Sequence, residues 1–231
     1  MFSKLITQLL AEFLGTFFLL LTIPLASHGV ATLSPLAIGF ILSAMSFSLR
    51  HICGAHFNPA ICFAAFVNKS LSYSLFVGYV FVQIIAGFFA AVYVSSIHES
   101  KILFVGVEVD IGDIWRLALW EFIYTFALVS VVLHVSFSGQ RQNDFYGLSI
   151  GMLLLSAAFT DDKRTVSLLN PAAVTGAELL SWLRGSSDSF IFFLVSWIAP
   201  MSAAFVGSIF FQMLDTKDDR VRRPTNIAMI Y

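Results

Sequence analysis

The feature that most constrains this chain is the length of its stretches without charge. No Asp, Glu, Lys or Arg occurs in five of them, 13–49, 70–98, 122–140, 145–160 and 189–214. A helix that crosses a bilayer needs about 20 mainly apolar residues. The first stretch is long enough for two spans, and 70–98 and 189–214 are long enough for one each. The two shorter stretches nearly suffice once flanking residues are counted, so the pattern predicts six spans in a polytopic membrane protein.

The composition excludes several other classes of protein. Hydrophobic residues make up 58% of the chain and charged residues only 12%, against roughly 25% charged residues in a soluble domain. A disordered chain, a coiled coil and a nucleic-acid binder with a basic face are therefore excluded. Lys4 and the apolar run after it resemble a signal peptide, but Glu12 interrupts that run and further spans follow, which favours an uncleaved first helix. The two cysteines are expected to be small buried residues.

Two short apolar segments differ from the expected spans. The spans are predicted at about 5–25, 35–49, 71–95, 114–137, 145–159 and 189–214. Asp113 is the expected N-cap of the span at 114–137. Segments 50–69 and 165–183 are apolar but irregular, and each contains Asn followed by Pro. They are too irregular for ordinary spans.

The chain repeats itself at offsets of about 110 residues. Three pairs of short motifs occur in the same order: EFLGTF at 12–17 and EFIYTF at 121–126, NPA at 58–60 and 170–172, and IAG at 85–87 and IAP at 198–200. Each repeat, at about 5–95 and 114–214, holds three spans and one short segment. An odd number of spans inverts the second repeat relative to the first. We therefore expect one domain over 1–231, ending in a tail at 215–231.

The two Asn-Pro pairs indicate half-helices that begin within the membrane. Asn is favoured at a helix cap and Pro at the first helical position, so Asn58 and Asn170 would each cap such a helix. In an inverted repeat the two helices enter from opposite faces and meet at their N-termini, each carrying about +0.5 of an elementary charge. Such a place repels cations, and the Asn amides can donate hydrogen bonds there. A single Asn-Pro is more often a simple loop-to-helix junction, but two at matching places favour a functional site.

The sequence also resembles a known family. The run CGAHFNPA at 53–60 resembles the first signature loop of the aquaporins, or major intrinsic proteins, and the second signature is similar at Asn170, Pro171 and Ala172. Asn58, Pro59 and Ala60 form the first motif, and residues 11–16, Gln83 and 197–200 also fit. The resemblance covers about 5–214. It implies an all-α fold of six tilted spans plus two re-entrant half-helices, and a homotetramer in membrane lipid with one pore per subunit.

Two buried-looking carboxylates occupy equivalent positions in the repeats. A charge at mid-membrane costs about 2.5–3.5 kcal/mol on insertion scales, so Glu12 and Glu121 need a role. The resemblance implies a structural one, in which each carboxylate accepts hydrogen bonds from the backbone of a signature loop, with His56 and Gln83 as further loop support. The alternative is a proton relay in a coupled transporter.

The expected selectivity filter departs from the family pattern. The family usually has an aromatic residue at the position that aligns with Ile38, often a His at the position of Leu154, and an Arg at the position of Ala173. Ser167, in the loop before Asn170, is the fourth residue of the expected filter. This filter would be apolar and without fixed charge, so the pore is expected to be wider than that of a strict water channel. The stretch before Asn170 is also about four residues longer than usual, so loop 160–169 is an alternative determinant of selectivity.

The distribution of Lys and Arg favours cytoplasmic termini. That orientation puts Lys4, Arg50, Lys69, Arg141, Lys217, Arg220, Arg222 and Arg223 inside, and Lys101, Arg116, Lys163, Arg164 and Arg184 outside. We expect a multi-pass passive channel for water and small neutral solutes, which in branches of the family include glycerol, urea, ammonia and hydrogen peroxide. The alternatives are a proton-coupled secondary transporter and a closed-pore tetrameric scaffold or junction protein. No nucleophile–base pair or metal set is visible, so neither an enzyme, a cofactor nor a nucleic-acid partner is expected.

Overall fold

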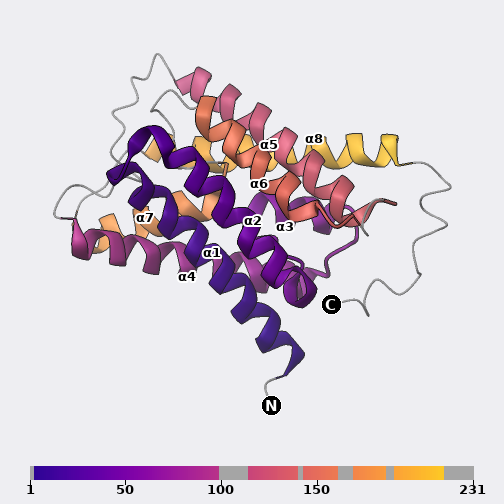
Figure 1. Ribbon diagram of the computed structural model, residues 1–231, viewed down its shortest axis with the longest axis horizontal. Helices are drawn as coiled ribbons and strands as arrows, with labels where there is room; N and C mark the ends of the chain where they lie inside the picture. The colour runs from indigo at the N-terminus through magenta and orange to yellow at the C-terminus, as the bar shows by residue number, and fades with distance from the viewer. Residues whose placement is uncertain (1–2, 99–113, 140–142, 161–168, 186–189, 216–231) are drawn as a thin grey trace.

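The computed structural model describes residues 3–98, 114–139, 143–160, 169–185 and 190–215, and these contain helices and no strand (Figure 1). The elements are α1 (Lys4–His28), η1 (Ala31–Leu33), α2 (Ser34–Cys53), α3 (Pro59–Val67), α4 (Tyr73–Ile97), α5 (Ile114–Phe137), α6 (Tyr146–Thr160), α7 (Pro171–Leu183) and α8 (Phe190–Leu214). The predicted spans and short segments all form helices. The predicted cap at Asp113 lies outside the described residues.

The largest difference from the predicted boundaries is at the end of α2. This helix continues past the expected end at Leu49 as far as Cys53, so the first part of the segment predicted to be irregular is helical. Nothing between Leu49 and Cys53 breaks a helix, whereas Gly54 has φ 93°, the left-handed conformation that commonly ends one. The irregular backbone is therefore confined to the few residues between Gly54 and Asn58.

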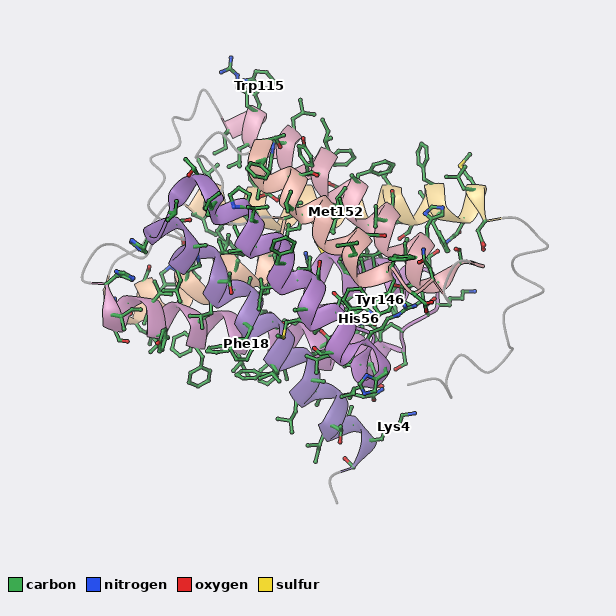
Figure 2. The ribbon with its side chains drawn as sticks, viewed as in Figure 1. Lys4, Phe18, His56, Trp115, Tyr146 and Met152 are labelled. Carbon is green, nitrogen blue, oxygen red and sulfur yellow. The ribbon has the colours of Figure 1, made fainter. Side chains whose placement is uncertain are left out.

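The helices have the length and apolar surface of membrane spans. Five of them, α1, α2, α4, α5 and α8, are long and apolar enough to cross a bilayer, whereas α6 is apolar but has only 15 residues. The span expected at about 145–159 forms α6 with nearly the same bounds, and the residues that follow it, 161–168, lie outside the described part of the chain. Large apolar side chains face outward, such as Trp115, which is 59% exposed and projects from the start of α5 (Figure 2). Such a surface suits contact with lipid or with another subunit.

The helix packing has a matching contact in each half of the chain. Helix α1 packs on α2 and α4, as α5 packs on α6 and α8. The short helices cross between the halves, because α7 packs on α4 and α3 packs on α8. Helix α2 packs on α6 at the junction of the two halves. Each half thus supplies a short helix that packs on a long helix of the other half.

Glycines allow α7 to approach α4 closely. A Cβ on Gly87 would lie 2.5 Å from the carbonyl oxygen of Ala172, and a Cβ on Gly176 would lie 2.8 Å from the Cα of Gly87. Both distances are shorter than van der Waals contact, so neither position accepts a larger residue without a shift of the backbone. This crossing sets the depth at which the N-terminus of α7 lies.

Candidate functional site

The N-termini of α3 and α7 meet inside the bundle. Asn58 caps α3, and its Oδ1 accepts a hydrogen bond of 2.8 Å from the backbone N–H of Ala60. Asn170 caps α7 in the same way, with a bond of 3.1 Å from the N–H of Ala172. Pro occupies the first position of each helix, where a missing N–H costs nothing. Both Asn side chains are buried, so the two caps are held in the interior of the protein.

Each Asn also binds the backbone that precedes the other. The Asn58 amide donates to the carbonyl oxygen of Leu169 at 2.7 Å, and the Asn170 amide donates to the carbonyl oxygen of Phe57 at 2.9 Å. Phe57 and Leu169 have φ values of 52° and 63°, a left-handed conformation that is unusual for bulky residues. This conformation turns the two carbonyls toward the opposite half-helix. The reciprocal bonds lock the two N-termini together and leave one amide hydrogen of each Asn for a ligand.

Glu12 holds the irregular backbone in front of Asn58. Its Oε1 accepts from the backbone N–H of His56 at 2.8 Å, and its Oε2 accepts from the N–H of Phe57 at 2.8 Å and from the Gln83 amide at 3.0 Å. His56 Nδ1 lies 3.1 Å from Oε1 as well. The carboxylate is fully buried, so these contacts replace the hydrogen bonds that it would make to water. Four donors around one carboxylate fit an anchor for the loop.

Close packing fixes the ring of Phe57. A Cβ on Gly15 would overlap the Phe57 ring, so α1 offers a flat site at this one position. Phe57 is fully buried there. Its backbone binds Glu12 on one side and Asn170 on the other. The ring therefore positions a residue that connects the two halves of the chain.

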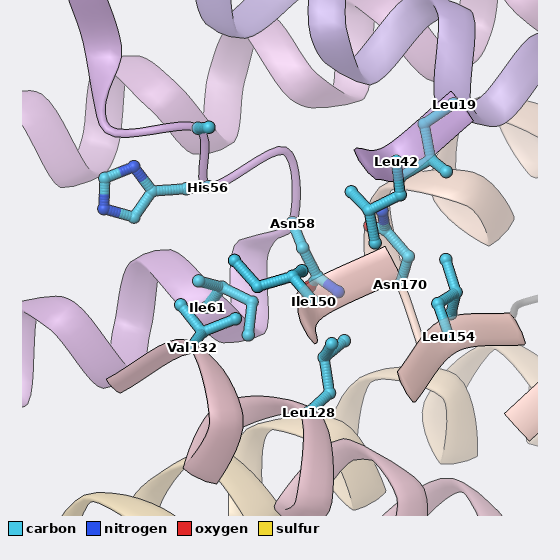
Figure 3. Close-up of a pocket in the computed structure, with 11 residues that line it drawn as sticks. Leu19, Leu42, His56, Asn58, Ile61, Leu128, Val132, Ile150, Leu154 and Asn170 are labelled. Atoms are coloured by element: carbon cyan, nitrogen blue, oxygen red, sulfur yellow. The ribbon is translucent and has the colours of Figure 1, made fainter. Parts of the chain in front are cut away.

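The two Asn side chains line a narrow cavity. Its volume is about 20 Å³, and about 10–15 Å³ on this measure suffices for one water molecule. Figure 3 shows Asn58 and Asn170 among aliphatic side chains, with the His56 ring directed away from Asn170. The lining consists of Leu19, Leu42, Ala55, His56, Asn58, Ile61, Leu128, Val132, Ile150, Leu154 and Asn170. Two amide donors therefore lie beside an apolar cavity that is large enough for a water molecule.

The structure brings only part of the expected filter to this cavity. Leu154 of α6 lines it. Ile38 and Ala173 are buried in α2 and α7 but do not line it, and Ser167 lies outside the described residues. Ala173 follows the second motif directly, and its N–H donates to the carbonyl oxygen of Asn170 at 3.0 Å. None of the three described positions supplies a charge.

Glu121 occupies the position in the second repeat that Glu12 occupies in the first. It is fully buried in α5. The backbone that corresponds to the Glu12 loop falls mostly on 161–168, outside the described residues. Cys53 and Cys62 are free and buried, as predicted. Within the described ranges, no group of three or more His, Cys, Asp or Glu side chains could hold a metal ion.

Sequence reasoning missed the residues that build most of the passage. The left-handed Phe57 and Leu169 each precede an Asn-Pro pair, and that shared position is the only signal that could have singled them out. The aliphatic lining from α1, α2, α5 and α6 has no motif, since Leu, Ile and Val are abundant throughout the chain. These residues become a set only when the helices pack.

Comparisons with known proteins agree with this architecture. A model of the major intrinsic protein family matches residues 2–211. A glycerol uptake facilitator protein-like 6 of Lactiplantibacillus plantarum is 28% identical over 208 residues, covering 87% of this chain and 96% of the relative. The aquaporin AqpM of Methanothermobacter thermautotrophicus is 26% identical over 239 residues, covering 90% and 97%.

The fold is also that of a solved channel. The X-ray structure of the aquaglyceroporin from Plasmodium falciparum superposes with a TM-score of 0.79 at 21% sequence identity, covering 94% of this chain and 99% of that one. The predicted all-helical, aquaporin-like fold is confirmed by this match. Since the family match spans nearly the whole chain, the protein belongs to the major intrinsic protein family and is a membrane channel, not an enzyme.

Proposed function

We propose that the cavity beside Asn58 and Asn170 is the pore of this channel, and that it passes water and small neutral solutes along their gradients. The reciprocal hydrogen bonds of the two Asn side chains carry this proposal. They place two half-helix N-termini and two amide donors at one point of an apolar passage. Relatives named as an aquaporin and as a glycerol uptake facilitator support both kinds of permeant.

The same geometry provides a reason for the exclusion of cations. Two helix N-termini that face one point carry about half a positive charge each, and the effect is strong where water is excluded. A water molecule can accept hydrogen bonds from both amides as it passes. A cation loses its hydration and meets donors only. We therefore assign ion exclusion to the Asn pair, because no Arg occupies the position after the second motif.

Selection among neutral solutes rests on width in this proposal. The aliphatic side chains around the Asn pair offer no hydrogen bonds to replace those that a polar solute leaves behind in water. Discrimination between water and solutes such as glycerol or urea should therefore be weak wherever the solute fits. The alternative is that loop 160–169 covers the outer mouth and sets selectivity, which a shortened Asp161–Arg164 loop would reveal.

The decisive experiment measures flux through the purified protein in liposomes. Stopped-flow light scattering with water, glycerol and urea would be recorded for the wild type and for Ile150→Trp, which puts an indole into a cavity of about 20 Å³. Leu148→Trp on the same helix is the matched control, because Leu148 faces outward. We expect all fluxes to fall in the first variant and to stay near wild type in the second.

A widening variant protects the test against misfolding. Leu128→Ala removes a lining side chain and should raise glycerol flux more than water flux. Wild-type flux no higher than that of empty liposomes would support the closed-pore scaffold instead. Uptake against a solute gradient, driven by a pH difference, would support the proton-coupled transporter. Either result would overturn the proposal.

We further propose six passes with both termini cytoplasmic, two inverted repeats and a homotetramer with one pore per subunit. The matching helix packings of the two halves support the repeats. The excess of Lys and Arg on the side of the membrane that would carry both termini supports the orientation. Cysteines introduced at Arg222 and Lys163 should be labelled from opposite sides of the membrane. Labelling of both from one side would refute the inverted repeat. Light scattering coupled to size exclusion would give the number of subunits.

A further inference from the structure

We infer that a second cavity, outside the Asn passage, binds a phosphate group. It has a volume of about 550 Å³ and lies between the start of α1, the end of α3 and the start of α4. Its lining shares only His56 with the narrow cavity. The residues that carry the inference are Lys4, Gln8, His56, Lys69, Ser72 and Tyr73. Figure 2 shows Lys4 near the start of the chain and His56 farther into the bundle, close to the Tyr146 label.

The electrostatics of this cavity favour an anion. Lys4 and Lys69 both line it, and neither forms an ion pair with another described residue. No Asp or Glu is found in the lining within the described part of the chain. The 25-residue helix α4 begins there at its cap, Ser72, with no acidic residue in its first turn. The Ser72 hydroxyl accepts a hydrogen bond from the Leu75 N–H, and the other first-turn N–H groups and the positive end of the helix dipole both attract negative oxygens.

His56 supplies an independent indication of a ligand. Its side chain is only 4% exposed, and its Nε2 atom has no hydrogen-bond partner, although the residue lines the cavity. A buried polar atom without a partner costs free energy that a ligand can recover. Gln8 is likewise buried, at 5% exposed, and lines the same cavity. Its amide makes no hydrogen bond to another described residue.

His56 also bears on the chemistry of the ligand. Glu12 can only accept at Nδ1, where the two atoms lie 3.1 Å apart, so Nε2 is the ring atom left for a ligand. Near neutral pH a phosphate group offers both a P–OH that can donate and oxygens that can accept, so it can bond to this atom in either role. Its other oxygens can accept from the lysines and from the start of α4.

Two sources supply the same group, inorganic phosphate from solution and the monoester headgroup of a lipid such as phosphatidic acid. A volume of about 550 Å³ leaves room for more than a single phosphate. The binding does not depend on channel activity, so it can be measured on the purified full-length chain in detergent. A failure of the proposed pore function would leave this inference standing, and the reverse also holds.

The test is equilibrium dialysis of the full chain against radiolabelled inorganic phosphate. Lys4→Gln and Lys69→Asn each remove one cation, and Asn suits the positive φ of 59° at residue 69. Arg184→Gln is the control, because Arg184 is exposed and bonds to Ser95 near the opposite end of α4. We expect saturable binding that weakens about fivefold to tenfold in either lysine variant and changes by less than about twofold in the control.

Competitors identify the source. Displacement by short-chain phosphatidic acid, but not by phosphatidylcholine, would assign the site to a lipid headgroup, and phosphate binding that the lipid does not displace would assign it to the soluble ion. The inference is overturned if neither phosphate nor phosphatidic acid binds, or if the control loses as much affinity as the lysine variants.

Discussion

Replacing Glu12 by Gln tests whether this carboxylate anchors the loop or carries protons. The substitution keeps size and shape and removes only the charge and one acceptor. Each carboxylate oxygen accepts from two donors, His56 N–H and Nδ1 on Oε1 and Phe57 N–H and Gln83 on Oε2. A Gln side chain leaves one oxygen and puts an NH₂ group where the other was. In either orientation, two donors lose their acceptor and face another donor.

The cost of this change follows from those contacts. A hydrogen bond to a charged group contributes about 1.5–3 kcal/mol, so the loss of two should lower the free energy of unfolding by about 3–6 kcal/mol. For a chain of this size, each kcal/mol corresponds to about 2–4 °C in melting temperature. Glu12→Gln should therefore lower the melting temperature by about 6–24 °C. Because the loop positions Phe57, which binds Asn170, flux per folded molecule should fall as well.

The assay combines thermal unfolding in detergent with flux in liposomes for the same preparations. Gln83→Met is the graded control. It removes one donor to Glu12 together with Gln83 Oε1, a buried atom that has no hydrogen-bond partner among the described residues. We expect a smaller fall in stability than in Glu12→Gln, because most of the carboxylate's acceptors stay satisfied.

A proton relay makes the opposite prediction. In that case Glu12→Gln would abolish pH-driven transport while leaving the melting temperature near that of the wild type. An unchanged melting temperature, with or without a change in flux, would show that the four contacts do not stabilise the fold. That result would refute the anchoring argument.

Four further substitutions test other parts of the structure. Asn58→Asp and Asn170→Asp each place a carboxylate between two positive helix ends, so water flux should fall and cation leak should rise; variants that fold and leave both unchanged would contradict the proposed ion barrier. Ala173→Arg adds five donors without removing any lining side chain, and should cut glycerol and urea flux far more than water flux in stopped-flow assays, whereas equal loss of all fluxes would indicate blockage. Gly176→Ala would bring a Cβ to 2.8 Å from a Cα of α4 and should cost about 1–3 kcal/mol. Thermal unfolding measures this cost, with Gly29→Ala as control because its nearest contact would be 3.6 Å.

Much of the fold and part of the site could be predicted because they depend on local chemistry. Stretches without charge predict helices in a membrane, since no polar alternative is stable there. The Asn-Pro pairs predict where α3 and α7 begin, since Asn caps and Pro fits the first turn. The end of α2 shows the limit of this reasoning, since the helix continues past Leu49 as far as Cys53. Hydropathy locates an apolar segment but not the residue at which its helix ends.

By itself, the sequence determined the class of protein, the positions of its helices and the two residues at which the half-helices begin. Each of these follows from residue types within one turn or one span. Only the tertiary structure decided what those residues do together. The amide of Asn58 finds a carbonyl at Leu169, and the amide of Asn170 finds one at Phe57. Glu12 collects four donors from two other segments, and Lys4, Lys69 and His56 share a cavity. These partners lie far apart in the chain, and only the packing of the helices brings them within hydrogen-bonding distance.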